Sequence, residues 1–466
     1  MRKPWALGLF LGGLLAAWLI VAPPPWGVLP LVNAEWQASG VWRLRQLVLN
    51  LSGVLSIGLM AFIMVLALRL PWMERLLGGM DQVYRLHKWA GIGAGVFALM
   101  HWGAKESGSF IRDVWSTAGR PARDVVLPWA VQWRSTAKDI GEIAFYILMA
   151  LLVLTLWQRL LNYRNWRWTH RVMPVIFLAL ALHSILLMPQ VYWAQPLGVL
   201  MAGLFAAGAL ASVISLLGGI GKARTHRAHV HSIRLLGPSE AHSPLEVVCA
   251  MPATWQGHRP GQFAFVSFAW VEGAHPFTIA SAPDALGTSA AGEALVRFII
   301  KPLGDFTGSL VHRLSEGQVV NVEGPYGAFD AQGNPSRDQV WIGAGVGVTP
   351  FIALLEARQR DVLGSGDMPQ GAPSTEMHYC TRDAAEDPLL PRLRQLCANA
   401  AEPVQLVVHD EAAGERLSGK VLQRAGRKPL DIWLCGPQGL VHSLRRACRA
   451  EGGRRWRLHH ELFAMR

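Results

Sequence analysis

Four histidines, two in each of two apolar segments, are the residues of this chain whose types and spacing most directly suggest chemistry. His87 and His101 lie in LHKWAGIGAGVFALMHW (86–102), and His170 and His183 lie in THRVMPVIFLALALHS (169–184). Each segment is apolar and long enough to cross a membrane. Because an imidazole is costly in hydrocarbon unless something satisfies it, four imidazoles at nearly equal spacing indicate a ligand.

The helical period predicts how these rings lie. The step from His87 to His101 is just under four helical turns, about 21 Å, so both rings leave nearly the same face. The step from His170 to His183 is about 3.6 turns, which would point the rings of an ideal helix apart. We therefore expect a frayed start at His170 or an irregular helix, with Pro174 as the cause because it removes a backbone hydrogen bond.

Two parallel helices would place His87 opposite His170 on the inner side of the membrane and His101 opposite His183 on the outer side. Two facing imidazoles are the axial ligands that a six-coordinate haem iron needs, so the pairs predict two haems, one above the other. Polar residues bonded to neighbouring carbonyls are the simpler alternative. A metal pathway or proton relay is another, although Glu142, near a helix end, is the only acidic residue within the predicted helices.

The composition divides the chain into a membrane half and a soluble half. It has 466 residues, is 51% hydrophobic and carries a net charge of +12, with the long apolar runs before about residue 220. The basic residues lie in no nucleic-acid recognition motif, so a nucleic-acid partner is not expected. Their positive charge suits the surface of a membrane. We predict a transmembrane domain over 1–220, whose six helices lie at about 5–22, 47–70, 83–103, 140–157, 168–188 and 196–219.

The topology of this half predicts that the soluble half faces the cytoplasm. An even number of spans returns the chain to the side of the membrane on which its first residues lie. The charge rule supports a cytoplasmic location only weakly, because basic residues are also frequent in the expected outer loop 104–139. The first helix is expected to be retained, because no small-residue cleavage site follows it. Five cysteines without metal-ligand spacing suit free thiols in a reducing compartment.

The soluble half reads as two domains. Short β-type runs separated by Gly and Pro turns predict an antiparallel β-barrel over 226–335. From 336 to 466, buried strands alternate with helical stretches, which predicts an α/β domain with a parallel sheet. The expected fold class is thus multidomain, with a six-helix bundle, a β-barrel and an α/β domain.

Four motifs in this half, in order along the chain, suit a flavin and a nicotinamide dinucleotide. HPFTIASAP (275–283) places aromatic and hydroxyl residues after a strand, and IIKPLGDFTGSL (299–310) adds a cation and a tight turn that suit a pyrophosphate. GAGVGVTP (343–350) follows a strand and opens a helix, where glycines let the backbone approach a phosphate. CGP (435–437) ends another strand. The candidate cofactor-binding residues are His275, Pro276, Phe277, Thr278, Ser281, Lys301, Gly304, Thr307, Gly343, Gly345, Gly347, Thr349, Pro350, Cys435, Gly436 and Pro437.

These residues and the histidine spacings together resemble the ferric reductase and NADPH oxidase superfamily, in its compact bacterial form. The resemblance covers about residue 47 to the C-terminus. It implies that the four histidines ligate two haems b and that the soluble half binds FAD and NADPH. By the same resemblance Arg382 in YCTRD meets the 2′-phosphate of NADPH, while Phe463 in the terminal HELFAMR stacks on the flavin. Cys435 and Phe463 are the candidate catalytic residues.

The expected function is the transfer of electrons from cytoplasmic NADPH through FAD and two haems to an acceptor outside a bacterial inner membrane. Oxygen and a ferric complex are both possible acceptors. No calcium-binding loop or partner-docking extension is visible, so no obligatory regulatory subunit is expected. Alternatives are a haem-containing membrane donor to a periplasmic partner protein, docking on 104–139, and a transporter with a fused nucleotide domain.

Overall fold

The computed structural model describes residues 5–21, 40–118, 120, 125–157, 163–240, 242–268, 273–331, 337–365, 375–400, 404–417, 429–450 and 456–461. The chain divides into two compact units, Arg2–Gly221 and Lys222–Arg466. Each unit has hydrophobic cores built only from its own described residues.

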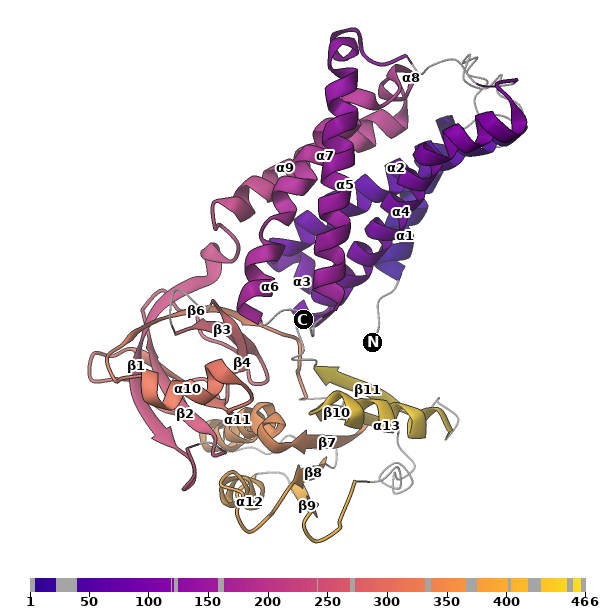
Figure 1. The fold of residues 1–466 in the computed structure, drawn as a ribbon. Helices are drawn as coiled ribbons and strands as arrows, with labels where there is room; N and C mark the ends of the chain where they lie inside the picture. Colours follow the sequence, from indigo (N-terminus) through magenta and orange to yellow (C-terminus); the bar gives the residue numbers. More distant parts are fainter. Residues whose placement is uncertain are drawn as a thin grey trace. The chain divides into compact units, whose positions relative to one another are not determined.

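The first unit is helical throughout its described part (Figure 1). Its elements are α1 (Trp5–Val21), α2 (Gly40–Ala67), α3 (Pro71–Leu77), α4 (Met80–Trp115), the 3₁₀-helix η2 (Pro128–Trp133), α5 (Arg134–Leu156), α6 (Tyr163–His170), α7 (Met173–Leu187), α8 (Gln190–Trp193) and α9 (Pro196–Leu216).

Small residues bring α2 and α4 close together. Ala90, Ala94 and Ala98, spaced four apart on α4, are all buried. Such a stripe lets two helix backbones approach, and the Ser56 hydroxyl on α2 donates a 3.0 Å hydrogen bond to the Ala94 carbonyl. The close packing holds α4, and with it His87 and His101, in a fixed position against α2.

The predicted count of six spans is confirmed only in part. Among the described residues, four helical segments are long and apolar enough to cross a membrane: Gly40–Ala67, Pro128–Leu156, Asn165–Leu187 and Pro196–Leu216. The helix at Trp5–Leu19 is apolar but shorter. The predicted helix 83–103 is instead the longer α4, which continues to Trp115 through charged residues that the sequence had suggested were loop.

The irregularity expected beside His170 is present. Helix α6 ends at His170 and α7 begins at Met173, with Pro174 in its first turn. Pro174 has no N–H to donate to the carbonyl of His170, its partner four residues back in a continuous helix. The helix is therefore interrupted between His170 and His183, as the sequence predicted.

The second unit begins with a six-stranded antiparallel sheet in the order β4-β3-β6-β1-β2-β5. Its outer strands β4 and β5 meet at a single bridge, Ile279 to Phe298. The antiparallel sheet is therefore confirmed, whereas a barrel closed by a full ladder stays a prediction. The elements are η3 (Lys222–Arg224), β1 (Thr225–Leu235), β2 (Leu245–Met251), β3 (Phe263–Ser267), β4 (His275–Thr278), β5 (Ala294–Ile300), α10 (Asp305–Arg313) and β6 (Val319–Tyr326).

A five-stranded parallel sheet follows, in the order β11-β10-β7-β8-β9, as predicted for an α/β domain. Alternation along β7 gives the sheet two buried faces: Trp341 packs with residues of α11 and α12, while Val340 and Ile342 pack with α13. The elements are β7 (Asp338–Ala344), η4 (Gly345–Val348), α11 (Thr349–Ser365), β8 (Thr375–Thr381), α12 (Leu390–Ala398), β9 (Val404–Asp410), β10 (Leu430–Cys435), α13 (Gln438–Ala450) and β11 (Trp456–Glu461).

Candidate functional site

The four histidines of the helical unit form two facing pairs, as their spacing predicted. The ring centroids of His87 and His170 are 6.1 Å apart, and those of His101 and His183 are 6.4 Å apart. His87 and His101 lie on α4, His170 ends α6, and His183 lies on α7. One helix therefore supplies one ring of each pair.

The spacing of each pair fits a haem iron between the rings. Two metal–nitrogen bonds of about 2 Å and two ring radii of about 1 Å add to about 6 Å between centroids. Among the described residues, no group of three or more His, Cys, Asp or Glu side chains is arranged to hold a metal ion. A six-coordinate haem takes only two axial ligands from the protein, which is what each pair offers.

Main-chain carbonyls orient three of the four rings. The Nδ1 atoms lie 3.2 Å from the Ile63 carbonyl for His87, 2.8 Å from that of Leu49 for His101 and 2.7 Å from that of Ala137 for His183. A carbonyl only accepts, so each Nδ1 carries the proton and Nε2 keeps its lone pair for a metal. His170 differs: its ring stacks on Trp166, and its buried Nδ1 makes no hydrogen bond in the described structure.

Two glycines make room for the rings of the second pair. A Cβ placed on Gly53 would lie 3.0 Å from Nδ1 of His101, and one on Gly141 would overlap the ring of His183. Each glycine stands four residues after the carbonyl that its histidine uses, at Leu49 and Ala137. The missing side chain thus exposes that carbonyl to the imidazole. The sequence contains these glycines, but only the packing connects them to the histidines.

In the second unit, the predicted nucleotide motifs meet at one edge of the parallel sheet. Gly343 at the end of β7 is in register with Cys435 at the end of β10, and Cys435 with Glu461 at the end of β11. Strand β8 ends alongside at Thr381, directly before Arg382. The carboxyl edge of a parallel sheet is where such folds bind ligands.

The glycine-rich turn and the CGP turn interlock at this edge. A Cβ on Gly347 would overlap the Cys435 carbonyl, and one on Gly436 would lie 3.1 Å from the Cβ of Ala344. Gly345 has a φ of +53°, in the left-handed region that glycine tolerates. Thr349 and Pro350 then begin α11, directly after the 3₁₀-helix η4. The arrangement suits a nucleotide phosphate.

The predicted flavin residues lie on β4, in the loop after it, directly after β5 and at the start of α10. His275 stacks on Phe306 at 4.2 Å, and the motif from His275 to Thr278, with Pro276 and Phe277 between them, pairs with β3. Thr307 accepts a 2.9 Å hydrogen bond from the Leu303 N–H, which shapes the turn at Gly304.

Lys301 and Ser281 have surroundings that the sequence did not reveal. The Lys301 ammonium lies 4.0 Å from a Cβ placed on Gly345, so this cation reaches the nucleotide turn as well as following β5. Ser281 has no exposed surface, and its hydroxyl accepts the Arg297 N–H at 3.2 Å. The Ser281 hydroxyl therefore supports the loop after the flavin motif.

The remaining candidates are Phe463, Arg382 and the cysteine at the end of β10, Cys435. Phe463 lies outside the described residues, so its stacking on a flavin stays a prediction. Arg382 is exposed, as contact with a ligand requires. The five cysteines form no disulfide with one another, and burial raises the pKa of Cys249 to about 12 and that of Cys380 to about 11.

Sequence reasoning missed a buried cluster of charged residues behind these motifs. Arg297 lies in the otherwise apolar strand ALVRFII, and Glu356 in the helix segment FIALLE. A charge in a buried apolar run was the available signal, because such a charge requires a partner.

Comparisons with known proteins agree with both halves of the chain. Residues 52–181 match the ferric reductase like transmembrane component, and residues 231–330 match an FAD-binding domain. The chain is 27% identical over 174 residues to the flavohemoprotein of Bordetella pertussis, covering 35% of this chain and 41% of that protein.

Two eukaryotic oxidases are similar to the same degree. Identity is 27% over 227 residues to the respiratory burst oxidase homolog protein F of Arabidopsis thaliana, covering 42% of this chain and 22% of that protein. It is 26% over 210 residues to a superoxide-generating NADPH oxidase heavy chain of Dictyostelium discoideum, covering 41% and 36%. The chain thus spans less than half the length of each of these relatives.

A bundle of apolar helices joined to an FAD-binding sheet and a parallel nucleotide-binding sheet defines a membrane flavoprotein oxidoreductase. Within that class, the helical half matches the ferric reductase like transmembrane component, and the chain is similar to NADPH oxidases.

Proposed function

We propose that the chain passes electrons from cytoplasmic NADPH through FAD and two haems b to an acceptor on the outer side of the bacterial inner membrane. The observation that carries the proposal is the pair of facing imidazoles at each of two positions along α4, 6.1 and 6.4 Å between centroids. Bound FAD would accept a hydride and haem would carry single electrons, which joins two-electron to one-electron chemistry.

The residues of each pair would hold one haem iron through their imidazole nitrogens. His87 and His170 would hold one iron, and His101 and His183 the other. Because two protein imidazoles would occupy each iron, we propose that the acceptor is reduced without binding to it. Oxygen and a ferric chelate both suit such outer-sphere transfer.

The nucleotide edge would receive NADPH. The main chain of the glycine-rich turn 343–347 and the ammonium of Lys301 would face the pyrophosphate. Arg382, after the neighbouring strand β8, would meet the 2′-phosphate through charge-assisted hydrogen bonds. Cys435 and Phe463 would lie nearest the nicotinamide, and Phe463 would have to leave the flavin face before the nicotinamide could stack there.

A reduced-minus-oxidised absorption spectrum of the purified full chain tests this proposal. We expect b-type haem bands, bound FAD, and reduction of both by NADPH. Replacing His101 with Ala should remove about one of two haems per chain while NADPH still reduces the flavin. A chain without haem bands contradicts the proposal. Reduction of oxygen and of ferric chelates then identifies the acceptor, and activity that needs a second protein indicates a membrane donor to a periplasmic partner.

A further inference from the structure

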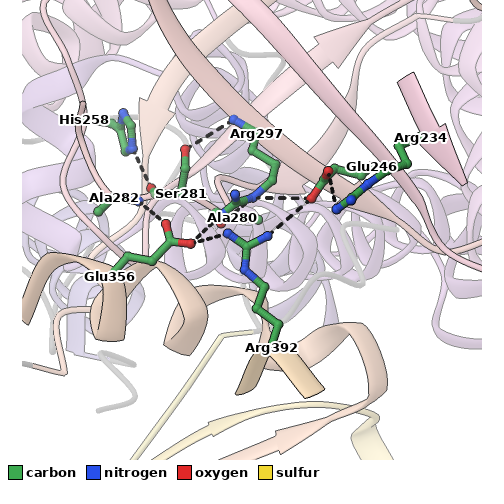
Figure 2. A network of polar contacts seen from close by, with 9 residues as sticks. All are labelled: Arg234, Glu246, His258, Ala280, Ser281, Ala282, Arg297, Glu356 and Arg392. Atoms are coloured by element: carbon green, nitrogen blue, oxygen red, sulfur yellow. Dashed lines mark hydrogen bonds and ion pairs between the residues drawn. The ribbon is translucent and has the colours of Figure 1, made fainter. Parts of the chain in front are cut away.

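A buried group of charged side chains joins the flavin-binding sheet to the nucleotide-binding domain (Figure 2). We name Glu246 of β2, Arg297 of β5, Glu356 of α11 and Arg392 of α12 the interdomain cluster. Glu246, Arg297 and Glu356 are each less than 10% exposed. Arg234 extends from Glu246 toward solvent, with 3.0 Å between Nη2 and Oε1.

Glu356 is the centre of the interdomain cluster. Its Oε1 accepts hydrogen bonds from Arg297 at 2.6 Å and from Arg392 at 2.5 Å. Its Oε2 accepts the N–H of Ala282 at 3.1 Å. Arg392 continues to Glu246 at 3.4 Å. One carboxylate on the nucleotide-binding helix therefore holds both a side chain and the main chain of the flavin-binding sheet.

The contacts on the flavin side fall on the loop that follows the flavin motif. The Arg297 guanidinium donates to the Ala280 carbonyl from Nε at 3.0 Å and from Nη2 at 2.5 Å. Its main-chain N–H donates to Ser281, whose carbonyl is 2.9 Å from Nε2 of His258. Residues 280–282 begin two positions after Thr278, so the loop fixed here is continuous with the strand expected to contact the flavin.

Strand β5 contacts helix α11 through Arg297, and the residue that follows β5 lies near the turn that precedes α11. Arg297 bonds Glu356, and Lys301, four residues further along the same chain, reaches the turn at Gly345. Glu356 stands two helical turns, about 10 Å, beyond Thr349. Because a strand and a helix are both stiff, the bond between Arg297 and Glu356 limits how far α11, and the nucleotide turn that precedes it, can shift along β5.

We propose that the interdomain cluster sets the position of the nucleotide turn against the flavin loop, which makes Glu356 a positioning residue for hydride transfer. This inference rests on the proposed function, since it assumes NADPH at the turn and FAD beside β4. Buried ion pairs of this kind are directional, and removing one member leaves the others unpaired in a low-dielectric interior. Hydride transfer depends on the approach of the two cofactors, for which a displacement of about 1 Å can cost about 100-fold in rate.

Hydrogen exchange on the full chain with FAD and haem, without nucleotide, tests the structural part. Glu356→Gln keeps the side-chain size and removes the charge, while Glu386→Gln changes an exposed carboxylate of the same domain as a control. We expect amide exchange in peptides covering 280–285 and 343–350 to become about tenfold faster in Glu356→Gln alone. Exchange equal to wild type in both regions overturns the proposal.

Stopped-flow reduction of the flavin by NADPH tests the kinetic part. The limiting rate in Glu356→Gln should fall about tenfold or more, with unchanged FAD content and half-saturating NADPH within about twofold of wild type. A limiting rate like that of Glu386→Gln, or a fall explained by lost FAD, overturns the proposal.

Two further measurements cover a variant that does not accumulate and a wild-type flavin that no nucleotide reduces. If Glu356→Gln does not accumulate, Arg392→Gln removes the more exposed member of the interdomain cluster and should lower the limiting rate about threefold; an unchanged rate is contrary to the proposal. If neither NADPH nor NADH reduces the wild-type flavin, the proposed function fails, and the exchange measurement still decides whether the interdomain cluster fixes the two loops.

Discussion

Main-chain carbonyls determine which nitrogen of each paired histidine is free. His87, His101 and His183 each direct Nδ1 at a carbonyl of a neighbouring helix. Such a hydrogen bond fixes the tautomer, orients the ring and raises the basicity of Nε2. Glycine is the residue that permits this approach beside His101 and His183. At the scale of single residues, the site therefore depends on glycines beside two of the histidines as well as on the histidines themselves.

We expect Gly141→Ala to displace His183 and to lower the haem content from about two to about one per chain. The added methyl group would overlap the imidazole, whose Nδ1 is held by the Ala137 carbonyl at 2.7 Å. Gly91→Ala on α4 is the matched control, because a Cβ there meets nothing within 4 Å. Haem content is measured by the pyridine haemochrome assay. Equal haem content in the two variants would refute this role of Gly141.

Arg382 is predicted to set the preference for NADPH. Its loss in Arg382→Ala should cost about 1.5–3 kcal/mol of discrimination, the usual contribution of hydrogen bonds to a charged group. That corresponds to about a 10- to 150-fold fall in the ratio of kcat/KM for NADPH over NADH. Arg394→Ala, at an exposed arginine of α12, should leave the ratio unchanged. The same ratio in both variants would place the 2′-phosphate elsewhere.

At the scale of elements, one interruption decides how a helix presents its histidines. Helix α6 ends at His170, and α7 resumes at Met173 after a turn in which the Val172 N–H bonds the Thr169 carbonyl at 3.2 Å. In a continuous helix the 13 residues from His170 to His183 make about 3.6 turns, so the two rings would point away from one another. The break lets two histidines on successive segments face two histidines on the single helix α4.

Replacing Pro174 with Ala restores the missing N–H and should favour a continuous helix across this turn. We expect the pair His87 and His170 to lose its haem, while the pair His101 and His183 keeps one. Pro196→Ala, at the start of α9, is a control for the loss of a proline in a first helical turn. Haem per chain and the shape of the reduced haem band distinguish the two variants; two haems in Pro174→Ala would show that the break does not depend on the proline.

At the scale of the whole molecule, the chain consists of two units with separate cores. Leu59, Phe177 and Met201 belong to the core of Arg2–Gly221, whereas Phe298 and Trp341 belong to cores of Lys222–Arg466. A unit that buries its own apolar residues can fold without its neighbour. The proposed haem and dinucleotide sites are thus built by different units.

The fragment 222–466 should therefore bind FAD and be reduced by NADPH without any haem. Its absorption spectrum should contain flavin bands alone, and stopped-flow reduction should proceed within about threefold of the rate in the full chain, because hydride transfer uses groups of this unit only. The full chain with His101→Ala provides the comparison. A fragment that is soluble but binds no FAD would show that the helical unit contributes to the flavin site.

Local patterns in the sequence were sufficient to predict the class of each element. Apolar runs of membrane length, the alternation of short strands with glycine turns, and the two histidine spacings are properties of neighbouring residues, which helical and strand geometry convert directly into structure. Hence the helical half, the antiparallel sheet, the parallel sheet and the facing histidine pairs were predictable. The ends of helices were less so: α4 extends past its apolar run because packing against other elements supports it.

Apart from the histidine pairs, tertiary structure alone decided which distant residues meet. Glu356 bonds Arg297, 59 residues earlier in the chain, and Lys301 reaches Gly345 rather than serving only the flavin turn. Gly141 stands beside His183, and its importance comes from that proximity. No local period encodes such pairs, since each depends on the register and packing of elements that are far apart in sequence. A buried charge predicts that a partner exists, but only the folded chain specifies which partner it is.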